Sequence, residues 1–315
     1  MLGVGLFGDN GHQIQDLLVR HPKARLVGSA FCAAAFHQPP PGTRIYTNLA
    51  EMLADGEIEL VSLCSPVRAE QAEQAVRCLE AGKHVYAEKP CAFTEADLDR
   101  ILSMAARAGK SFHEMAGTAF EEPYLSMGEI VASGEIGEVV QVFAQKSYPY
   151  HNRRPQDEDV DGGLIRQAAV HALRLIEHTA RQRIVEISAT ETGLGNPKKG
   201  GLRMAANLTM TLENGGIALV AANYLNQSGH GEWGNDHLRI FGAKGFVEST
   251  DGGRRTRLVV GGEDRGEIPR RENVPSYFDM LVDEILGLGK MPLTSEEELH
   301  PTRMAIRAKD GAKRC

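Results

Sequence analysis

The sequence lacks the features that mark membrane and nucleic-acid-binding proteins. No apolar run approaches the roughly 18 residues of a membrane span, and long clean runs, such as residues 217–222, have the length of a strand. The formal charge is −7, from 35 basic and 42 acidic residues. There is thus no basic surplus to neutralise the phosphates of nucleic acid or of an anionic membrane. We therefore expect neither as a partner.

Cysteine is also sparse. The five cysteines are scattered, odd in number and never arranged as C-x-x-C. This pattern argues against a disulfide framework and against a structural zinc site, so no metal is expected. Residues 1–8 have neither the charged start nor the long apolar core of a secretory signal. The sequence predicts a reduced, cytoplasmic protein.

The remaining composition is globular, with 42% hydrophobic and 24% charged residues among 315, a length typical of two domains. Apolar strands alternate with amphipathic helices over the first part of the chain. Strands are expected near residues 4–7, 25–31, 58–64, 84–87 and 111–115, and helices near 11–19, 69–81 and 94–108. This alternation predicts an α/β Rossmann domain, a doubly wound parallel sheet, over residues 1–118.

Residues 119–315 follow a different pattern. Helices are expected near 121–132, 164–180, 277–286 and 302–313, and strands with hairpin-like spacing lie between 139 and 260. Asn214-Gly215 is a strong hairpin signal. We expect an α+β domain with an open, mainly antiparallel sheet. Because an open sheet exposes one face, we also expect a homodimer or homotetramer through this domain.

The turn after the first strand has small residues where a dinucleotide site needs them. Gly8 and Gly11 let the backbone approach a pyrophosphate, and Asn10 and His12 lie in the same loop. Asn10 and Gln13 replace the second and third glycines of G-x-G-x-x-G, so a plain glycine turn is the alternative.

The second predicted strand ends without the Asp or Glu that usually binds the adenosine ribose. Phe31 stands near that position and is a candidate for packing on the adenine. No arginine follows it directly to hold a 2′-phosphate. The cofactor is therefore expected to be NAD or NADP, with no preference indicated.

The segment Glu88-Lys89-Pro90 follows a predicted parallel strand, at the edge where open α/β sheets bind ligands. A partly desolvated lysine beside a carboxylate can transfer a proton or hydrogen-bond a substrate hydroxyl. A solvated Glu–Lys pair in a turn is the alternative.

Four segments resemble motifs of the Gfo/Idh/MocA oxidoreductases, relatives of glucose-fructose oxidoreductase and inositol dehydrogenase. They are ELVSLCSP at 59–66, AGKHVYAEKP at 81–90, SGEIGEV at 133–139 and LRIFGAKG at 238–245. The resemblance implies a Rossmann domain and an open-faced sheet domain with nicotinamide between them. It implies that Lys89 touches the reacting hydroxyl. It also places Ser65, Pro66 and Glu88 with Lys89 at the cofactor.

The family's second site motif, G-G-x-x-x-D-x-x-x-H, resembles GGLIRQAAVH at residues 162–171. Gln167 and His171 are four residues apart, so both can reach one substrate from a helix face. His171 can act as acid or base, whereas Gln167 can only hydrogen-bond. The usual acid is replaced by Gln167, and Arg174 stands where a further Asp is usual. A buried helix histidine is the alternative for His171.

The resemblance implies an NAD(P)-dependent oxidoreductase acting on a secondary alcohol or ketone of a sugar or polyol. Lys89 and His171 would handle the proton, and Gln167, Tyr148 and Tyr150 would bind the substrate. A non-catalytic, cofactor-dependent binding or regulatory protein is the main alternative, because the glycine loop and the acid at position 167 are changed. A lyase or hydrolase that uses transient oxidation is a third.

Overall fold

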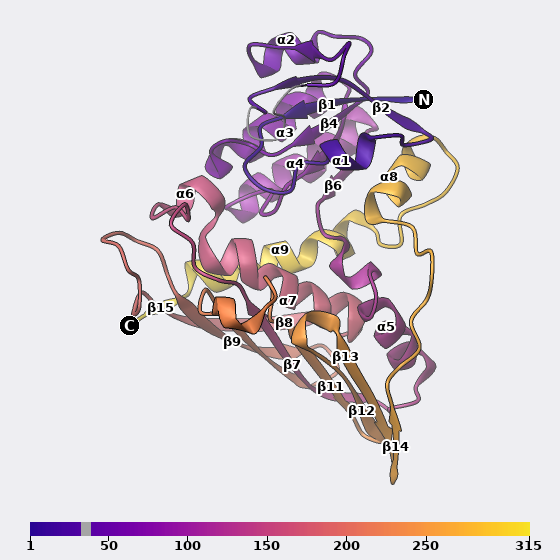
Figure 1. The fold of residues 1–315 in the computed structure, drawn as a ribbon, viewed down its shortest axis with the longest axis vertical. Coiled ribbons are helices and arrows are strands. Elements are labelled where there is room, and N and C mark those ends of the chain that lie inside the picture. The colour runs from indigo at the N-terminus through magenta and orange to yellow at the C-terminus, as the bar shows by residue number, and fades with distance from the viewer. Residues whose placement is uncertain (33–38) are drawn as a thin grey trace. The chain divides into compact units, whose positions relative to one another are not determined.

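The computed structural model of the protein describes residues 1–32 and 39–315. The chain forms two compact units (Figure 1). The first unit comprises Met1–Met115, Asp159–Gly162 and Tyr277–His300, and the second comprises Ala116–Glu158, Gly163–Ser276 and Pro301–Cys315. A single boundary after residue 118 was expected. The structure instead assigns two later segments to the first unit.

The first unit is built on a six-stranded sheet in the order β3-β2-β1-β4-β5-β6. All its pairings are parallel, and β1 separates β2 from β4, which is the topology of a doubly wound sheet. The predicted fold of this part is confirmed. The strands are β1 (Leu2–Phe7), β2 (Ala24–Ala30), β3 (Arg44–Ile45), β4 (Leu60–Leu63), β5 (His84–Ala87) and β6 (Phe112–Glu114).

One predicted helix of this unit is much shorter than expected. The helix predicted over residues 11–19 is wrong in length, since α1 spans only Gln15–Leu18. The preceding amides bond elsewhere: that of His12 donates to Glu88, and that of Ile14 donates to the Gln13 side chain. The other helices before residue 115 are α2 (Leu49–Leu53), η1 (Arg68–Glu70), α3 (Gln71–Glu80) and α4 (Glu95–Ala108).

Buried charged contacts join the segment Tyr277–His300 to the first unit. Glu298 is fully buried and accepts from the Glu114 amide at 2.7 Å and from His113 Nδ1 at 2.6 Å. His113 Nε2 lies 3.1 Å from Glu284 Oε1, at the end of α8 (Tyr277–Ile285). The imidazole of His113 thus bridges two carboxylates, which ties this late segment to β6.

This bridge makes the stability of the first unit pH-dependent. Burial alone would lower the pKa of His113, but Glu298 and Glu284 raise it from 6.5 to about 9. Because the folded pKa is above the unfolded one, the stabilisation is full below pH 6.5 and is lost as pH rises through about 9. We expect His113→Gln to remove roughly 3 kcal/mol of unfolding free energy at pH 6 but little at pH 10. Urea titrations at both pH values measure this, and an equal loss at both would contradict it.

The second unit is built on a nine-stranded sheet in the order β14-β13-β12-β11-β7-β10-β9-β8-β15. Strand β10 runs parallel to β7, as β15 does to β8, and the other pairings are antiparallel. The predicted mainly antiparallel sheet is confirmed. The strands are β7 (Val139–Ser147), β8 (Ile184–Thr192), β9 (Ala205–Leu212), β10 (Ile217–Asn223), β11 (His237–Gly242), β12 (Gly245–Thr250), β13 (Arg255–Val260), β14 (Glu263–Gly266) and β15 (Lys313–Arg314).

Helices cover one face of this sheet (Figure 1). The predicted helix over residues 164–180 is present as a run of π-helical and α-helical turns, η3 (Leu164–Ala169), α7 (Val170–Arg174) and η4 (Leu175–Thr179). Its apolar side chains form the core with alternate residues of β7, β9 and β10. The remaining helices are η2 (Gly117–Phe120), α5 (Tyr124–Ser133), α6 (Glu158–Asp161), η5 (Ser228–His230), η6 (Asp251–Gly253) and α9 (Ser295–Asp310).

Among the described residues, no helix is both long enough and apolar enough to cross a membrane.

Candidate active site

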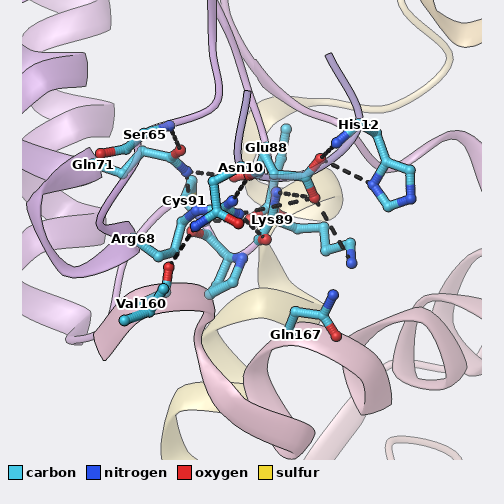
Figure 2. Close-up of polar contacts among 12 residues, drawn as sticks. Asn10, His12, Ser65, Arg68, Gln71, Glu88, Lys89, Cys91, Val160 and Gln167 are labelled. Atoms are coloured by element: carbon cyan, nitrogen blue, oxygen red, sulfur yellow. Dashed lines mark hydrogen bonds and ion pairs between the residues drawn. The ribbon is translucent and has the colours of Figure 1, made fainter. Parts of the chain in front are cut away.

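The carboxyl ends of three neighbouring strands bring the predicted cofactor residues of the first unit together. In the parallel register, Phe7 pairs with Leu63, and Leu63 pairs with Ala87. Gly8, Ser65 and Glu88 therefore leave the sheet at the same edge, after β1, β4 and β5. Figure 2 shows the polar contacts among the residues that gather there.

Glu88 is the centre of these contacts. Its carboxylate is 1% exposed and accepts from the His12 amide at 2.6 Å, from His12 Nδ1 at 2.9 Å and from the Lys89 amide at 3.1 Å. Burial alone would raise the pKa of Glu88, but Lys89, then His12 and Arg68, lower it well below its usual range. The structure therefore holds a buried, ionised carboxylate against the glycine loop.

Lys89 lies beside this carboxylate and is as deeply buried. Its side chain is 1% exposed, and its Nζ is 3.7 Å from Glu88 Oε1. A lysine is rarely buried to this extent without an opposite charge, and Glu88 supplies one. The alternative of a solvated Glu–Lys pair is wrong, because neither side chain reaches the solvent.

Two residues that the sequence analysis did not single out fix this segment in place. Arg68, 2% exposed, donates to the carbonyl oxygens of Lys89 and Asn10. Gln71, fully buried, accepts from the Ser65 amide at 3.1 Å and donates to the carbonyl oxygens of Glu88 at 2.5 Å and Pro90 at 3.1 Å. Both follow Pro66 closely, yet in the sequence they look like ordinary polar residues at the start of a surface helix.

The glycine loop is packed by the chain itself. Gly8 has φ +72° and a Cβ there would lie 2.0 Å from the Cys64 carbonyl oxygen, while a Cβ on Gly11, φ +130°, would lie 2.7 Å from Glu88. Asn10 Nδ2 donates to the carbonyl oxygens of Pro66 at 3.1 Å and Val160 at 2.7 Å. Both glycines are thus required by close approach of the loop to β4 and to Glu88.

In the second unit, Gln167 and His171 lie on the π-helical and α-helical run, and each has a partner from another element. Tyr224 donates its hydroxyl to Gln167 Oε1 at 3.4 Å. Thr118 Oγ1 lies 3.4 Å from His171 Nδ1, and His171 is 8% exposed. Single π-helical turns often occur at functional sites. The partners Thr118 and Tyr224 were not predicted.

Tyr148 and Tyr150, predicted to bind the substrate, follow the end of β7. Both are half-buried and pack against the core of the second unit. The Nζ atom of Lys146 lies over the Tyr148 ring, 5.0 Å from the ring centroid.

Two family models match most of the chain. The model described as "Oxidoreductase family, NAD-binding Rossmann fold" matches residues 1–115, and the "GFO/IDH/MocA C-terminal domain" matches residues 124–248. The chain belongs to the GFO/IDH/MocA family of oxidoreductases. The family expected from the sequence is confirmed, as is its NAD-binding Rossmann domain.

Curated relatives and solved structures agree with this family. "Uncharacterized oxidoreductase YrbE" of Bacillus subtilis is 25% identical over 263 residues, which cover 80% of this chain and 73% of that protein. "Myo-inositol 2-dehydrogenase" of Thermotoga maritima is 24% identical over 269 residues, covering 81% and 77%. The solved aldose-aldose oxidoreductase from Caulobacter crescentus, complexed with glycerol, has a TM-score of 0.78 at 20% identity and covers 98% of both chains. This last likeness shows the fold.

The edge of the first sheet fits the nicotinamide dinucleotide of this family, with one departure. The crevice between β1 and β4, where the strand order reverses, is where such sheets bind ligands. However, the amides of Asn10, Gly11 and His12 already donate to Cys64, Asp9 and Glu88, and α1 is only four residues long. The open row of helix amides that usually receives a pyrophosphate is therefore reduced here.

Phe31, the candidate for packing on adenine, has unusual geometry at the end of β2. Its side chain is 55% exposed and its φ is +57°, a conformation that bulky residues rarely adopt. The ring lies edge-on to Phe7 at a centroid distance of 5.5 Å. This aromatic side chain therefore stands at the same carboxyl edge as Gly8.

Among the described residues, no group of three or more His, Cys, Asp or Glu side chains is placed to hold a metal ion.

Proposed function

We propose that the protein is an NAD(P)-dependent oxidoreductase that transfers a hydride between nicotinamide and a secondary alcohol, or the corresponding ketone, of a sugar or polyol. The observation that carries this proposal is the burial of Lys89 beside the ionised Glu88 at the carboxyl edge of β5. A buried ammonium held by a carboxylate is preorganised to donate to a developing alkoxide. The inositol dehydrogenase among the relatives supports the substrate class.

The bound nicotinamide would supply the hydride chemistry. Ser65, Pro66 and the loop from Gly8 to His12 would hold the cofactor, with Phe31 against the adenine. Either NAD or NADP is compatible with these residues.

The remaining steps belong to the chain's own residues. Lys89 donates a hydrogen bond to the substrate oxygen, and His171 takes the hydroxyl proton when the alcohol is oxidised and returns it when the ketone is reduced. Gln167, oriented by the Tyr224 hydroxyl, holds a neighbouring hydroxyl without changing its own charge. Tyr148 and Tyr150 would bind the substrate from the second unit.

A panel assay tests this function. The protein is supplied with NAD or NADP and a set of polyols and aldoses, and NAD(P)H formation is followed by absorbance. We expect turnover with at least one member. Cofactor binding without turnover across the panel would favour the non-catalytic alternative, which the replacement of the family's acid by Gln167 supports. Failure to bind either cofactor would contradict both the proposed oxidoreductase and its non-catalytic alternative.

We also propose a homodimer or homotetramer assembled through the open sheet face. Ile217 and Leu219 on β10 are 53% and 37% exposed, while the alternating Ala218 and Val220 are buried in the core. Leu219 pairs with the half-buried Phe143 on β7, so Ile217, Leu219 and Phe143 place apolar side chains together on the exposed face. We expect light scattering at micromolar concentration to give a dimer or tetramer mass. A monomer mass would contradict this proposal.

A further inference from the structure

The only tryptophan of the sequence, Trp233, lies in the loop between β10 and β11 and is 57% exposed. Two other rings flank it. The centroid of Tyr148 is 6.2 Å away at an interplanar angle of 39°, and that of His151 is 5.9 Å away at 32°. We call Trp233, Tyr148 and His151 the aromatic platform.

The exposure of Trp233 is fixed by its backbone. Asn226, 7% exposed, donates through Nδ2 to the carbonyl oxygens of Glu232 and Trp233, both at 3.0 Å. The Asn235 amide donates to Ser147 at 2.9 Å, and Gln145 Nε2 donates to the Asn235 carbonyl at 2.8 Å. The loop is therefore tied to β7 just after Trp233 and to its own start through Asn226. It presents a large apolar face in one position.

Contacts within the second unit link the platform to the proposed substrate residue Gln167. Because β7 and β10 are parallel, the loops that follow them leave the same edge of the sheet. Tyr224, just after β10, donates to Gln167, and the guanidinium of Arg154 lies 3.6 Å from the Tyr224 ring centroid. The Arg154 amide in turn donates to the His151 carbonyl at 3.0 Å.

The rim of the platform is polar. Glu232, next to Trp233, pairs with Arg254 at 2.8 Å, and both side chains are about half exposed. The core of an interface between copies is depleted of charged residues, whereas the charged pair of Glu232 and Arg254 adjoins Trp233. A flat aromatic face bordered by charged hydrogen-bonding groups instead matches a sugar ring, which has an apolar C–H face and hydroxyls at its edge.

We propose that the aromatic platform is a distal subsite for a pyranose ring, so that the substrate carries a second sugar ring beyond the one that is oxidised. The identity of the first ring rests on the proposed function. The distal subsite itself rests on the platform and its contacts. Trp233 stacks on the second ring, while Glu232 and Arg254 exchange their mutual pair for its hydroxyls.

Fluorescence tests the subsite without cofactor or turnover. Since Trp233 is the only tryptophan, its emission reports on the platform alone. The protein is titrated with cellobiose, maltose and lactose, and separately with glucose and myo-inositol. We expect a saturable emission change with at least one disaccharide, at an affinity about tenfold tighter than for either single-ring compound. No change with any disaccharide, or equal affinity for single rings, would overturn the proposal. An emission change on dilution alone would also overturn it, because it would indicate an interface between copies.

Two substitutions separate stacking from folding. Trp233→Phe keeps an aromatic face and is expected to bind the disaccharide within about threefold of the parent, whereas Trp233→Ala loses about tenfold, measured by calorimetry. Leu288→Ala, which removes a similarly exposed apolar side chain of the first unit, is the matched control and should bind as the parent does. Equal affinity of Trp233→Ala and the parent would contradict the proposal. Disaccharide binding without dehydrogenase activity would contradict the proposed function but support the distal subsite.

Discussion

Replacing Lys89 by methionine is expected to lower kcat by about 10²–10⁴-fold, the usual contribution of a positioned proton-transfer group. Methionine has a similar length but no ammonium, so the loss is chemical rather than steric. Affinity for NADH is expected to stay within severalfold of the parent, because the loop and Ser65 keep their contacts. Turnover with the best panel substrate and a fluorescence titration with NADH measure the two quantities.

Lys83 provides a matched control for this variant. This residue directly precedes β5. It is 9% exposed, and its Nζ donates to the carbonyl oxygens of Asp55 at 2.9 Å and Ile58 at 2.8 Å. Lys83→Met should lower the thermal midpoint without an effect on kcat. Activity retained by Lys89→Met would remove Lys89 from the mechanism. An equal loss of kcat in both variants would make the role of Lys89 structural.

Replacing Glu88 by glutamine is expected to lower the free energy of unfolding by about 3–5 kcal/mol, because it leaves the buried ammonium of Lys89 without this carboxylate. Cofactor affinity should fall as well, since the glycine loop loses its charged acceptor at His12. Urea denaturation at pH 7 measures the first effect. Folding lowers the pKa of Glu88. The difference in unfolding free energy between parent and variant should therefore be present above pH 4.5 and shrink only well below it.

Glu57 supplies the control for Glu88. Its carboxylate is 46% exposed and pairs with Arg25 and Arg44 at the surface, so Glu57→Gln should leave the unfolding free energy close to that of the parent. If Glu88→Gln were as mild as Glu57→Gln, the buried carboxylate would not stabilise the glycine loop.

Much of the fold follows from periodicity. Strand β5 spans residues 84–87, as expected, and the apolar run around β4 marks a strand buried on both faces. Short elements carry too little pattern to be found, which is why β3 and α2 were missed. The return of Tyr277–His300 to the first unit was also invisible. It depends on pairs such as His113 with Glu298, and these residues resemble surface charges until the chain folds.

The residues of the candidate site also include some that the sequence indicated and some that it did not. Two pairs, Glu88 with Lys89 and Gln167 with His171, could be selected because they stand in segments that resemble motifs of the family. Arg68 and Gln71 could not, since nothing in a polar helix start indicates that its side chains turn inward to bind carbonyl oxygens. Trp233 sits in a glycine-rich loop without periodicity, so its partners Tyr148 and His151 appear only in three dimensions.

A crystal structure of the protein with NADH bound tests the central claim most directly. We expect the nicotinamide ring to lie at the carboxyl edge of β5, with the Lys89 ammonium and the His171 imidazole both facing its reactive carbon. A nicotinamide bound away from Lys89, or a space between these two side chains closed by packed residues, would contradict the proposed mechanism.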